Sequence, residues 1–476
     1  MHKQKLYLHW TKLNQHLKLE TLISSLSTLL RPVILINAHP FQNEPPWAIL
    51  SHSPLFLWQS YDRENLFYGI QGIHNNVTYE NPWVCIEQIY KQYELQICQK
   101  PPFPFWGGFI GYLGYSLTPY AMDIKLRPKR KIYPDAELGF YHEFIQINLT
   151  TNEGYYGWLS DHPEISPSLL IEKSEQYIQN IYQHSPRKKS THYSKPIQSL
   201  DTYTSYEKKI EQIQNLIQKG TVYQINYTRP FETETSLSSL EIFQKLLKNN
   251  PEPYMALLGF ETPDIVMASP ERFLYIKDNY IQTRPIKGTR PRHINVSQDY
   301  QNALDLQNSA KDQAELTMIV DLERNDLGKV CDISSINVEQ NLTLEKHPTV
   351  YHLSSTISGK IKNDLGLWDV IRACFPGGSI TGAPKHQAIQ EIDQLEEHAR
   401  EIYTGALGYI DLAHHADLAM IIRGLYKIES KIKFFTGGGI VIDSDARSEY
   451  NETYDKACAL FDCLETTKER KENVAL

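Results

Sequence analysis

The sequence has few cysteines, and none of them form a recognisable metal or redox motif. No Cys-x-x-Cys pair occurs among the six, which are Cys85, Cys98, Cys331, Cys374, Cys458 and Cys463. This spacing argues against a zinc site and against a thioredoxin-like motif. A disulfide framework is not expected in a chain of 476 residues, so we expect reduced thiols.

The sequence also lacks a signal peptide, a membrane segment and an excess of basic residues. No apolar run follows the first five residues, and the most apolar early segment, residues 22–38, is interrupted by Arg31-Pro32. The formal net charge of −8 gives no general attraction to nucleic acid or to anionic lipid. We therefore expect a cytoplasmic protein without nucleic-acid or membrane partners, in which local cations or a metal hold any anionic substrate.

No internal repeat and no regular alternation of strands and helices is present, which favours an α+β fold with antiparallel sheets over a doubly wound fold. Residues 184–199 are polar and basic with two prolines, and they predict a linker between an amino-terminal region at residues 1–183 and a second domain at residues 200–468. Two further ranges, 33–37 and 141–148, are typical of strands.

The second domain begins with a predicted helix over residues 206–219, which ends at Gly220 and is followed by a strand near Gln224. Further on, the apolar run Leu418–Ile428 is typical of a strand but contains Arg423. An arginine in such a place needs an anion, which is either an internal carboxylate or a ligand.

Two segments hold candidate catalytic side chains. Glu271 could be a general acid, although a surface salt bridge with Arg272 is the more common role for such a pair. Lys287 lies in Thr283–Arg292, where two prolines and a glycine fix the backbone. A lone lysine is usually solvated, and a nucleophilic one must be neutral, which burial or nearby cations favour. The three arginines of this segment are compatible with that requirement.

Several acidic residues are spaced to share helix faces. Asp312 and Glu315 are three residues apart, and a predicted helix after Ser448 places Glu449, Glu452 and Lys456 on one face. Such groups are often solvated surface charges. Carboxylates from separate segments also suit Mg²⁺, which takes one or two of them and completes its shell with water and substrate.

A glycine-rich loop at Phe375–Lys385 leads into a helix expected to reach about Arg400, and helix N-termini bind anions. A Walker motif is absent because Ala383-Pro384 separates Gly382 from Lys385, so a carboxylate is a better candidate than a nucleotide phosphate. Residues 437–439 are all glycine, which allows close approach of the backbone. His352 is a lone histidine expected just before a strand, in either a structural or a catalytic role.

Six runs, in family order, resemble the chorismate-utilising enzymes, which include anthranilate synthase component I, aminodeoxychorismate synthase component I, and isochorismate and salicylate synthases. They are Ser269-Pro-Glu-Arg272, Pro285-Ile-Lys-Gly-Thr-Arg-Pro-Arg292, Asp321-Leu-Glu-Arg-Asn-Asp326, Gly382-Ala-Pro-Lys385, Gly437-Gly-Gly-Ile440 and Ser448-Glu-Tyr-Asn-Glu452. The resemblance implies antiparallel sheets packed as a sandwich with surrounding helices, as in anthranilate synthase component I.

Two positions indicate the branch of the family. Isochorismate and salicylate synthases have a water-activating lysine where this chain has Gln224, so ammonia is the expected nucleophile. Anthranilate synthases usually have alanine at the position of Lys287, whereas aminodeoxychorismate synthases have lysine. The resemblance thus implies formation of 4-amino-4-deoxychorismate from chorismate and ammonia, in the biosynthesis of 4-aminobenzoate and folate.

The resemblance also implies a role for individual residues. Lys287 would be the nucleophile and Glu271 the general acid, with His352 as a third catalytic residue, and Glu315 and Glu452 would hold Mg²⁺. Asp312 and Glu449 would lie behind these carboxylates. The expected substrate-binding residues are Gln224, Ser379, Tyr403, Arg423, Gly438, Gly439 and Lys456. Ser379 replaces the more common threonine, and the run ending at Tyr403 is a loose match.

Ammonia in cells comes from glutamine, but the sequence contains no segment typical of a glutamine amidotransferase. A separate glutaminase subunit is therefore an expected partner. The alternatives are an anthranilate synthase component I, or a non-catalytic binding protein with the same fold. The sequence does not decide the oligomeric state, or whether the amino-terminal half binds tryptophan.

Overall fold

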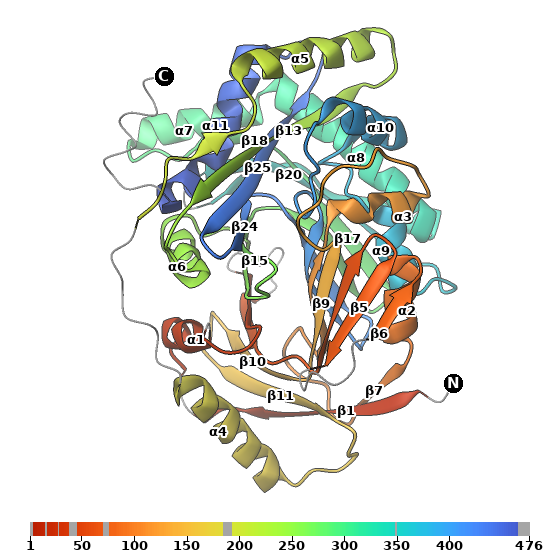
Figure 1. Ribbon diagram of the computed structural model, residues 1–476, viewed down its shortest axis with the longest axis vertical. Coiled ribbons are helices and arrows are strands. Elements are labelled where there is room, and N and C mark those ends of the chain that lie inside the picture. Colours follow the sequence, from red (N-terminus) through yellow and green to blue (C-terminus); the bar gives the residue numbers. More distant parts are fainter. Residues whose placement is uncertain are drawn as a thin grey trace.

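The computed structural model describes residues 3–14, 17–26, 28–37, 45–69, 76–183, 193–347 and 350–464. These residues form two large sheets surrounded by helices (Figure 1), which confirms the α+β class. Residues 184–192 of the predicted linker lie outside the described residues. No helix in the described ranges is long and apolar enough to cross a membrane.

The first sheet has thirteen strands, and every pair is antiparallel except the parallel pair β1 and β7. Its order is β12 (Gln198–Ser199), β13 (Gln224–Glu234), β25 (Lys431–Ile440), β24 (Gly424–Ile428), β15 (Asp264–Ser269), β14 (Tyr254–Leu258), β2 (Val33–Asn37), β3 (Trp47–Ser51), β10 (Glu143–Asn148), β11 (Gly154–Ser160), β1 (Gln4–Lys12) and β7 (Tyr93–Ile97), with β21 (Gly382–Ala383) beside β13.

The second sheet has twelve strands, all in antiparallel pairs. Its order is β18 (Ile286–Pro291), β20 (Val350–Lys360), β17 (Tyr280–Arg284), β16 (Arg272–Lys277), β23 (Ala416–Met420), β22 (Ala406–Asp411), β8 (Gly108–Leu113), β9 (Ala136–Tyr141), β4 (Phe56–Tyr61), β5 (Glu64–Gly69) and β6 (Asn76–Tyr79), with β19 (Asn337–Lys346) beside β20.

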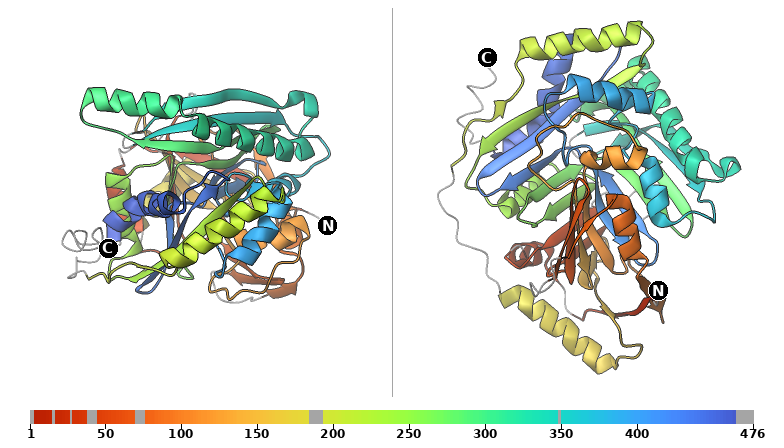
Figure 2. Two further views of the ribbon diagram at one scale, coloured as in Figure 1. Left: turned by 90° about the horizontal axis from the view of Figure 1, so that it is seen from above. Right: turned by 45° about the vertical axis from the view of Figure 1, so that its right-hand side comes forward.

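Eleven α-helices cover these sheets within the described ranges. They are α1 (Leu19–Leu26), α2 (Pro82–Tyr90), α3 (Thr118–Met122), α4 (Pro167–Gln183), α5 (Tyr203–Gln218), α6 (Ser239–Asn249), α7 (Val296–Gln307), α8 (Ala310–Val330), α9 (Leu367–Cys374), α10 (Lys385–Leu395) and α11 (Ala446–Leu464). Helices α7 and α8 form a layer against β18 and β20 (Figure 2), whereas α11 packs on β25.

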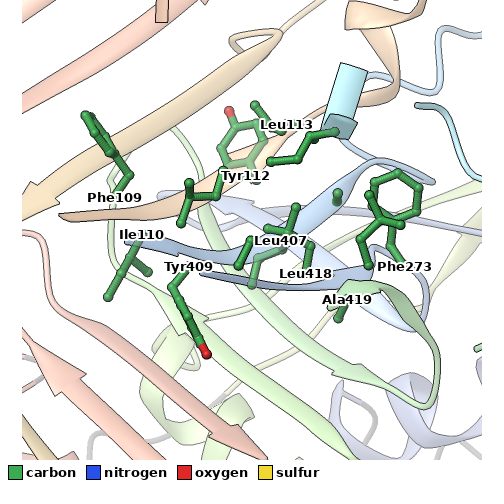
Figure 3. Packing of buried hydrophobic residues seen from close by; sticks show 14 of the residues in the cluster. Phe109, Ile110, Tyr112, Leu113, Phe273, Leu407, Tyr409, Leu418 and Ala419 are labelled. Atoms are coloured by element: carbon green, nitrogen blue, oxygen red, sulfur yellow. The ribbon is translucent and has the colours of Figure 1, made fainter. Parts of the chain in front are cut away.

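Both sheets continue from the first half of the chain into the second. Strand β14 pairs with β2 in one sheet, and β22 pairs with β8 in the other. Buried side chains such as Phe109 and Ile110 of β8 and Leu407 of β22 gather in one core there (Figure 3). The division into two domains stays a prediction, and hydrogen-bonded strands connect the two halves.

Several local predictions are confirmed. Strand β2 has the predicted bounds, and α5 covers the predicted helix with Thr202 as its N-cap. The run Tyr141–Asn148 is not one strand, because it breaks at His142 between β9 and β10, which belong to different sheets.

A cavity of about 280 Å³ lies between the sheets. Its lining includes the aromatic residues Trp47, Trp106, Tyr254 and Tyr409, contributed by both halves of the chain. None of the candidate site residues line it, so this cavity is separate from the candidate active site.

Candidate active site

The candidate site begins where β13 runs beside β25. Gln224 is buried at the start of β13, and its Nε2 atom lies 3.4 Å from Oε1 of Glu315 on α8. A Cβ atom added at Gly439 would lie only 1.9 Å from that Nε2 atom. The predicted close approach at the glycine run is therefore confirmed, and Gln224 is the side chain that occupies the space.

Lys287 reaches this site from β18. A register shift after Lys287, with Gly288 at φ +75°, turns the strand locally. Its Nζ atom donates to the carbonyl oxygen of Ser379 at 3.1 Å, in the predicted glycine-rich loop. The Lys287 charge favours the ionised carboxylates of Glu271, Glu315 and Glu452, so the amine lies among these three groups.

The three arginines near Lys287 have carboxylate partners. Arg284 pairs with Glu345, Arg290 with Asp312 at 3.1 Å, and Arg292 with Asp299 at 2.8 Å. Their effect on the charge of Lys287 stays a prediction.

Glu271 has the properties of a buried acid. The residue is 6% exposed, and burial raises the pKa of its carboxyl group to about 7, against opposing effects of the Ser379 side chain, Lys287 and Arg423. Such a pKa suits a general acid at neutral pH. The alternative of a surface salt bridge is wrong, because Arg272 is buried and pairs with Asp417 at 3.2 Å.

Glu315 and Glu452 approach the site from α8 and α11. Burial raises the pKa of Glu315, opposed by Lys287, Lys311 and Lys456, whereas the Lys456 ammonium group lowers the pKa of Glu452. The charges of the same three lysines lower the pKa of both carboxyl groups, so Glu315 and Glu452 face a common space. No group of three or more potential metal ligands was found among the described residues. Two carboxylates suit Mg²⁺, because that ion commonly keeps waters and binds substrate oxygens.

The remaining charged residues surround these two carboxylates. Asp312 accepts a hydrogen bond from Arg290, and Glu449 accepts one from Ser444 Oγ at 2.7 Å. Lys456 lies 2.8 Å from Glu452 and donates to the Gly437 carbonyl oxygen at 3.0 Å. A Cβ at Gly438 would lie 3.3 Å from Glu449 Oε2 and 3.4 Å from Lys456 Nζ, so this backbone also borders the site.

His352 lies inside β20, not before a strand as expected. Its Nδ1 atom is 3.0 Å from Thr289 Oγ1, on the strand that carries Lys287. Burial, together with the charge of Arg423, holds the pKa of His352 well below its usual value, so the ring is neutral at pH 7. This ring can accept or donate a hydrogen bond without adding charge to the site.

The prediction of one strand over Leu418–Ile428 is wrong. The chain leaves the second sheet at Met420, turns through Arg423 at φ +50°, and enters the first sheet at Gly424. Arg423 pairs with the buried carboxylate of Glu252, so the internal carboxylate is the anion observed.

Tyr403 also lies at the site. Its ring stacks on Phe435 with centroids 5.3 Å apart, and burial raises the pKa of its hydroxyl group. The Glu271 charge contributes to that rise, which places Tyr403 near the acid.

Sequence reasoning assigned no role to the residues that hold the glycine-rich loop. Glu323 accepts a hydrogen bond from Gly378 N at 2.9 Å, and Lys385 donates to the Pro376 carbonyl oxygen at 2.6 Å and to Asp326. The helix at Lys385 also ends at Leu395, before the expected Arg400. A cation in the first turn of a helix is unfavourable. The position of Lys385 just after the glycine-rich loop could therefore have indicated, from the sequence, that it has an internal anionic partner.

Several polar atoms at the site are buried without a hydrogen-bond partner among the described residues. They are Gln224 Oε1, Ser379 Oγ, His352 Nε2 and Glu252 Oε2. Buried polar groups are normally paired. Their concentration around Lys287 and Arg423 indicates a site for a polar ligand.

An amine beside a buried acid with a raised pKa, with two facing carboxylates, defines an enzyme-type site at the meeting of two large sheets. The chain belongs to the chorismate binding enzymes, whose family model matches residues 53–462. This confirms the resemblance carried by the six runs.

The relatives point to one branch more than to the others. The chain is 33% identical over 437 residues to aminodeoxychorismate synthase component 1 of Escherichia coli, covering 88% of this chain and 94% of that protein. It is also 33% identical over 360 residues to anthranilate synthase component 1 of Saccharolobus solfataricus, covering 75% and 81%. Anthranilate synthase component I of Streptococcus pneumoniae has the same fold, with a TM-score of 0.76, 26% identity, and coverage of 88% and 92%.

Proposed function

We propose that this chain converts chorismate and ammonia to 4-amino-4-deoxychorismate in the cytoplasm. The observation that carries the proposal is the Lys287 amine, held by the Ser379 carbonyl oxygen among Glu271, Glu315 and Glu452. The similarity to aminodeoxychorismate synthase component 1 over most of the chain supports it.

In the first chemical step, the neutral Lys287 amine adds to C2 of the chorismate ring. The ring double bond shifts, the bond between C4 and its hydroxyl oxygen breaks, and Glu271 gives its proton to that oxygen, which leaves as water. The pKa of about 7 keeps a large fraction of Glu271 protonated at neutral pH. A covalent intermediate divides one difficult displacement into two easier ones.

In the second step, ammonia attacks C4. The double bond shifts back, and the bond between C2 and the lysine nitrogen breaks, which releases the product and restores the Lys287 amine. A proton from the attacking nitrogen returns to the Glu271 carboxylate. Acid and nucleophile thus end the cycle as they began it.

Glu315 and Glu452 would hold one Mg²⁺, which when bound neutralises the ring carboxylate of the substrate. Arg423, Lys456 and the backbone of Gly438 and Gly439 would bind carboxylate oxygens. The unpartnered atoms of Ser379 and His352 supply further hydrogen bonds. Tyr403 closes the side near Glu271.

Gln224 decides between ammonia and water as the nucleophile. A neutral amide beside Glu315 cannot remove a proton from water. Ammonia needs no such activation, so the residue supports amination over hydration.

We further propose that a separate glutaminase subunit delivers the ammonia. The absence of a glutaminase segment in the sequence motivates this, and the component 1 names of the relatives fit it. Glutamine-dependent activity of this chain alone would contradict the proposal.

The test is product identification. The purified chain is incubated with chorismate, MgCl₂ and an ammonium salt, with Lys287→Ala as the control, and the product is identified by mass. A product that retains the enolpyruvyl group and replaces hydroxyl by amine supports the proposal. Anthranilate with free pyruvate would make the chain an anthranilate synthase, and no consumption of chorismate with a glutaminase partner present would make it a non-catalytic binding protein.

A further inference from the structure

Arg423 occupies a fixed position between the two sheets. Its backbone is left-handed at φ +50°, in the crossing from β23 to β24, and its carbonyl oxygen accepts a hydrogen bond from Ala268 N at 3.1 Å. A non-glycine residue in this conformation is held by its surroundings. The guanidinium group is therefore presented from a rigid turn.

Glu252 holds the guanidinium group from the side of the first sheet. This residue is 4% exposed and lies between Pro251 and Pro253, directly before β14. One carboxylate oxygen accepts from Nη1 of Arg423, and the other, Oε2, is buried without a partner among the described residues. No other side-chain partner of Arg423 is found in the described part of the chain.

Arg423 also lies near the proposed chemistry, because its backbone accepts the hydrogen bond of Ala268, three residues before Glu271. Its positive charge favours the ionised form of Glu271 and disfavours a charge on His352. His347 lies close as well, and burial lowers its pKa, so neither histidine is a competing cation for Glu252 at neutral pH. The guanidinium group is thus paired with one buried carboxylate and lies near Glu271 and His352, two residues of the candidate site.

We propose that Glu252 sets the affinity of the site for substrate carboxylate by sharing Arg423 with it. The inference rests on the proposed function, in which chorismate brings two carboxylates into the site. The carboxylate oxygen of Glu252 keeps Arg423 in place, and the negative charge of Glu252 partly neutralises the positive charge of Arg423. A substrate carboxylate binds the remaining N–H groups against this opposing charge. Glu252 is a positioning residue, because it acts through Arg423.

The two effects of Glu252 can be separated by two substitutions. Glu252→Gln keeps an oxygen for Nη1 but removes the charge, whereas Glu252→Ala removes both. Both should tighten binding of chorismate by about three- to tenfold, because a neighbouring opposing charge is lost at a partly shielded distance. Only the alanine variant should also lower kcat, by about tenfold or more, because only it loses the group that orients Arg423.

The experiment measures the Kd of chorismate by calorimetry with Lys287→Ala added to the unmodified chain and to each variant, so that the covalent step cannot occur, and then kcat with ammonia in the chains that keep Lys287. Glu211→Gln, an exposed change of the same charge on α5, is the control and should change neither value. Because both Glu252 variants report on binding, either one tests the proposal if the other does not fold. Unchanged or weaker binding in the folded variants overturns the inference while leaving the proposed function intact. An unmodified chain that binds no chorismate overturns both.

Discussion

Replacing Glu271 by glutamine should strongly reduce activity and, at high pH, stabilise the protein. Burial is the largest cause of the raised pKa of this carboxyl group, which moves from 4.5 to about 7. Glutamine has the same shape and carries no charge at any pH. The variant therefore removes both the proton donor and the buried carboxylate.

The magnitude follows from the two pKa values. Each tenfold change in proton affinity corresponds to about 1.4 kcal/mol, so ionising Glu271 in the folded protein costs about 3 kcal/mol relative to the unfolded chain. Because the pKa of Glu271 is raised in the folded protein, the contribution of the protonated Glu271 to the free energy of unfolding is fully present below pH 4.5. This contribution is lost as the pH rises through about 7. Relative to the unmodified protein, Glu271→Gln should gain roughly 2 to 3 kcal/mol between pH 5 and pH 8.5.

Urea unfolding at pH 5 and pH 8.5 measures this difference, with Glu211→Gln as an exposed control. Burial raises the pKa of Glu323 to about 7, and Asp326 and, to a smaller extent, the Glu271 charge contribute to the rise. Removing the Glu271 charge therefore also favours the ionised form of Glu323, which stabilises the variant at high pH in the same direction. The kinetic counterpart is a kcat/KM that falls about tenfold per pH unit above pH 7 in the unmodified enzyme.

Chorismate consumption by Glu271→Gln should be reduced by about 100-fold or more. The reasoning is refuted if the variant keeps its activity, or if its stability relative to the unmodified protein is the same at both pH values.

Four further outcomes are expected. Lys287→Ala should reduce chorismate consumption by roughly 1,000-fold or more, measured by loss of substrate, because it removes the amine proposed to form the intermediate; near-normal turnover would exclude covalent catalysis. Removing Mg²⁺ with a chelator should abolish product formation and adding Mg²⁺ should restore it; activity without the metal would exclude its role. Gly439→Ala should weaken Mg²⁺ binding and raise the KM by about tenfold, because the new Cβ would lie 1.9 Å from Gln224 Nε2. Gly438→Ala, whose Cβ would lie 3.3 Å from its nearest atom, should have a smaller effect; equal effects would contradict the steric argument. Lys385→Met should lower the free energy of unfolding by about 3 kcal/mol in urea, since it leaves Asp326 buried with one cation fewer; an unchanged value would show that the pair contributes no net stability.

The sequence predicted those parts of the fold that depend on local periodicity. Helices α8 and α11 place Glu315 and Glu452 as the spacing indicated, and β2 has the predicted bounds. The site residues were found through the resemblance, because six short runs in order are specific. The structure brings these residues together from separate elements, which periodicity alone does not show.

The failures share a physical cause. The runs Tyr141–Asn148 and Leu418–Ile428 are continuous in their apolar pattern, yet each crosses from one sheet to the other. A strand pattern records that side chains are buried, but it does not record which sheet buries them. The partner of Arg423 is Glu252, 171 residues away, and no local signal specifies such a pairing.

The charges at the site support the proposed role of a metal with a dianionic substrate. The chain as a whole carries a formal charge of −8, so attraction of an anion must be local. Lys287, Lys311 and Lys456 all affect the carboxyl groups of Glu315 and Glu452, whereas Arg423 is paired with Glu252. In the proposed function, chorismate would bring two further negative charges beside Glu315 and Glu452, and one Mg²⁺ held by these two carboxylates would offset the repulsion. We therefore expect the pairing of Glu252 with Arg423 to be a separate control on substrate affinity, because the lysines that affect Glu315 and Glu452 take no part in it.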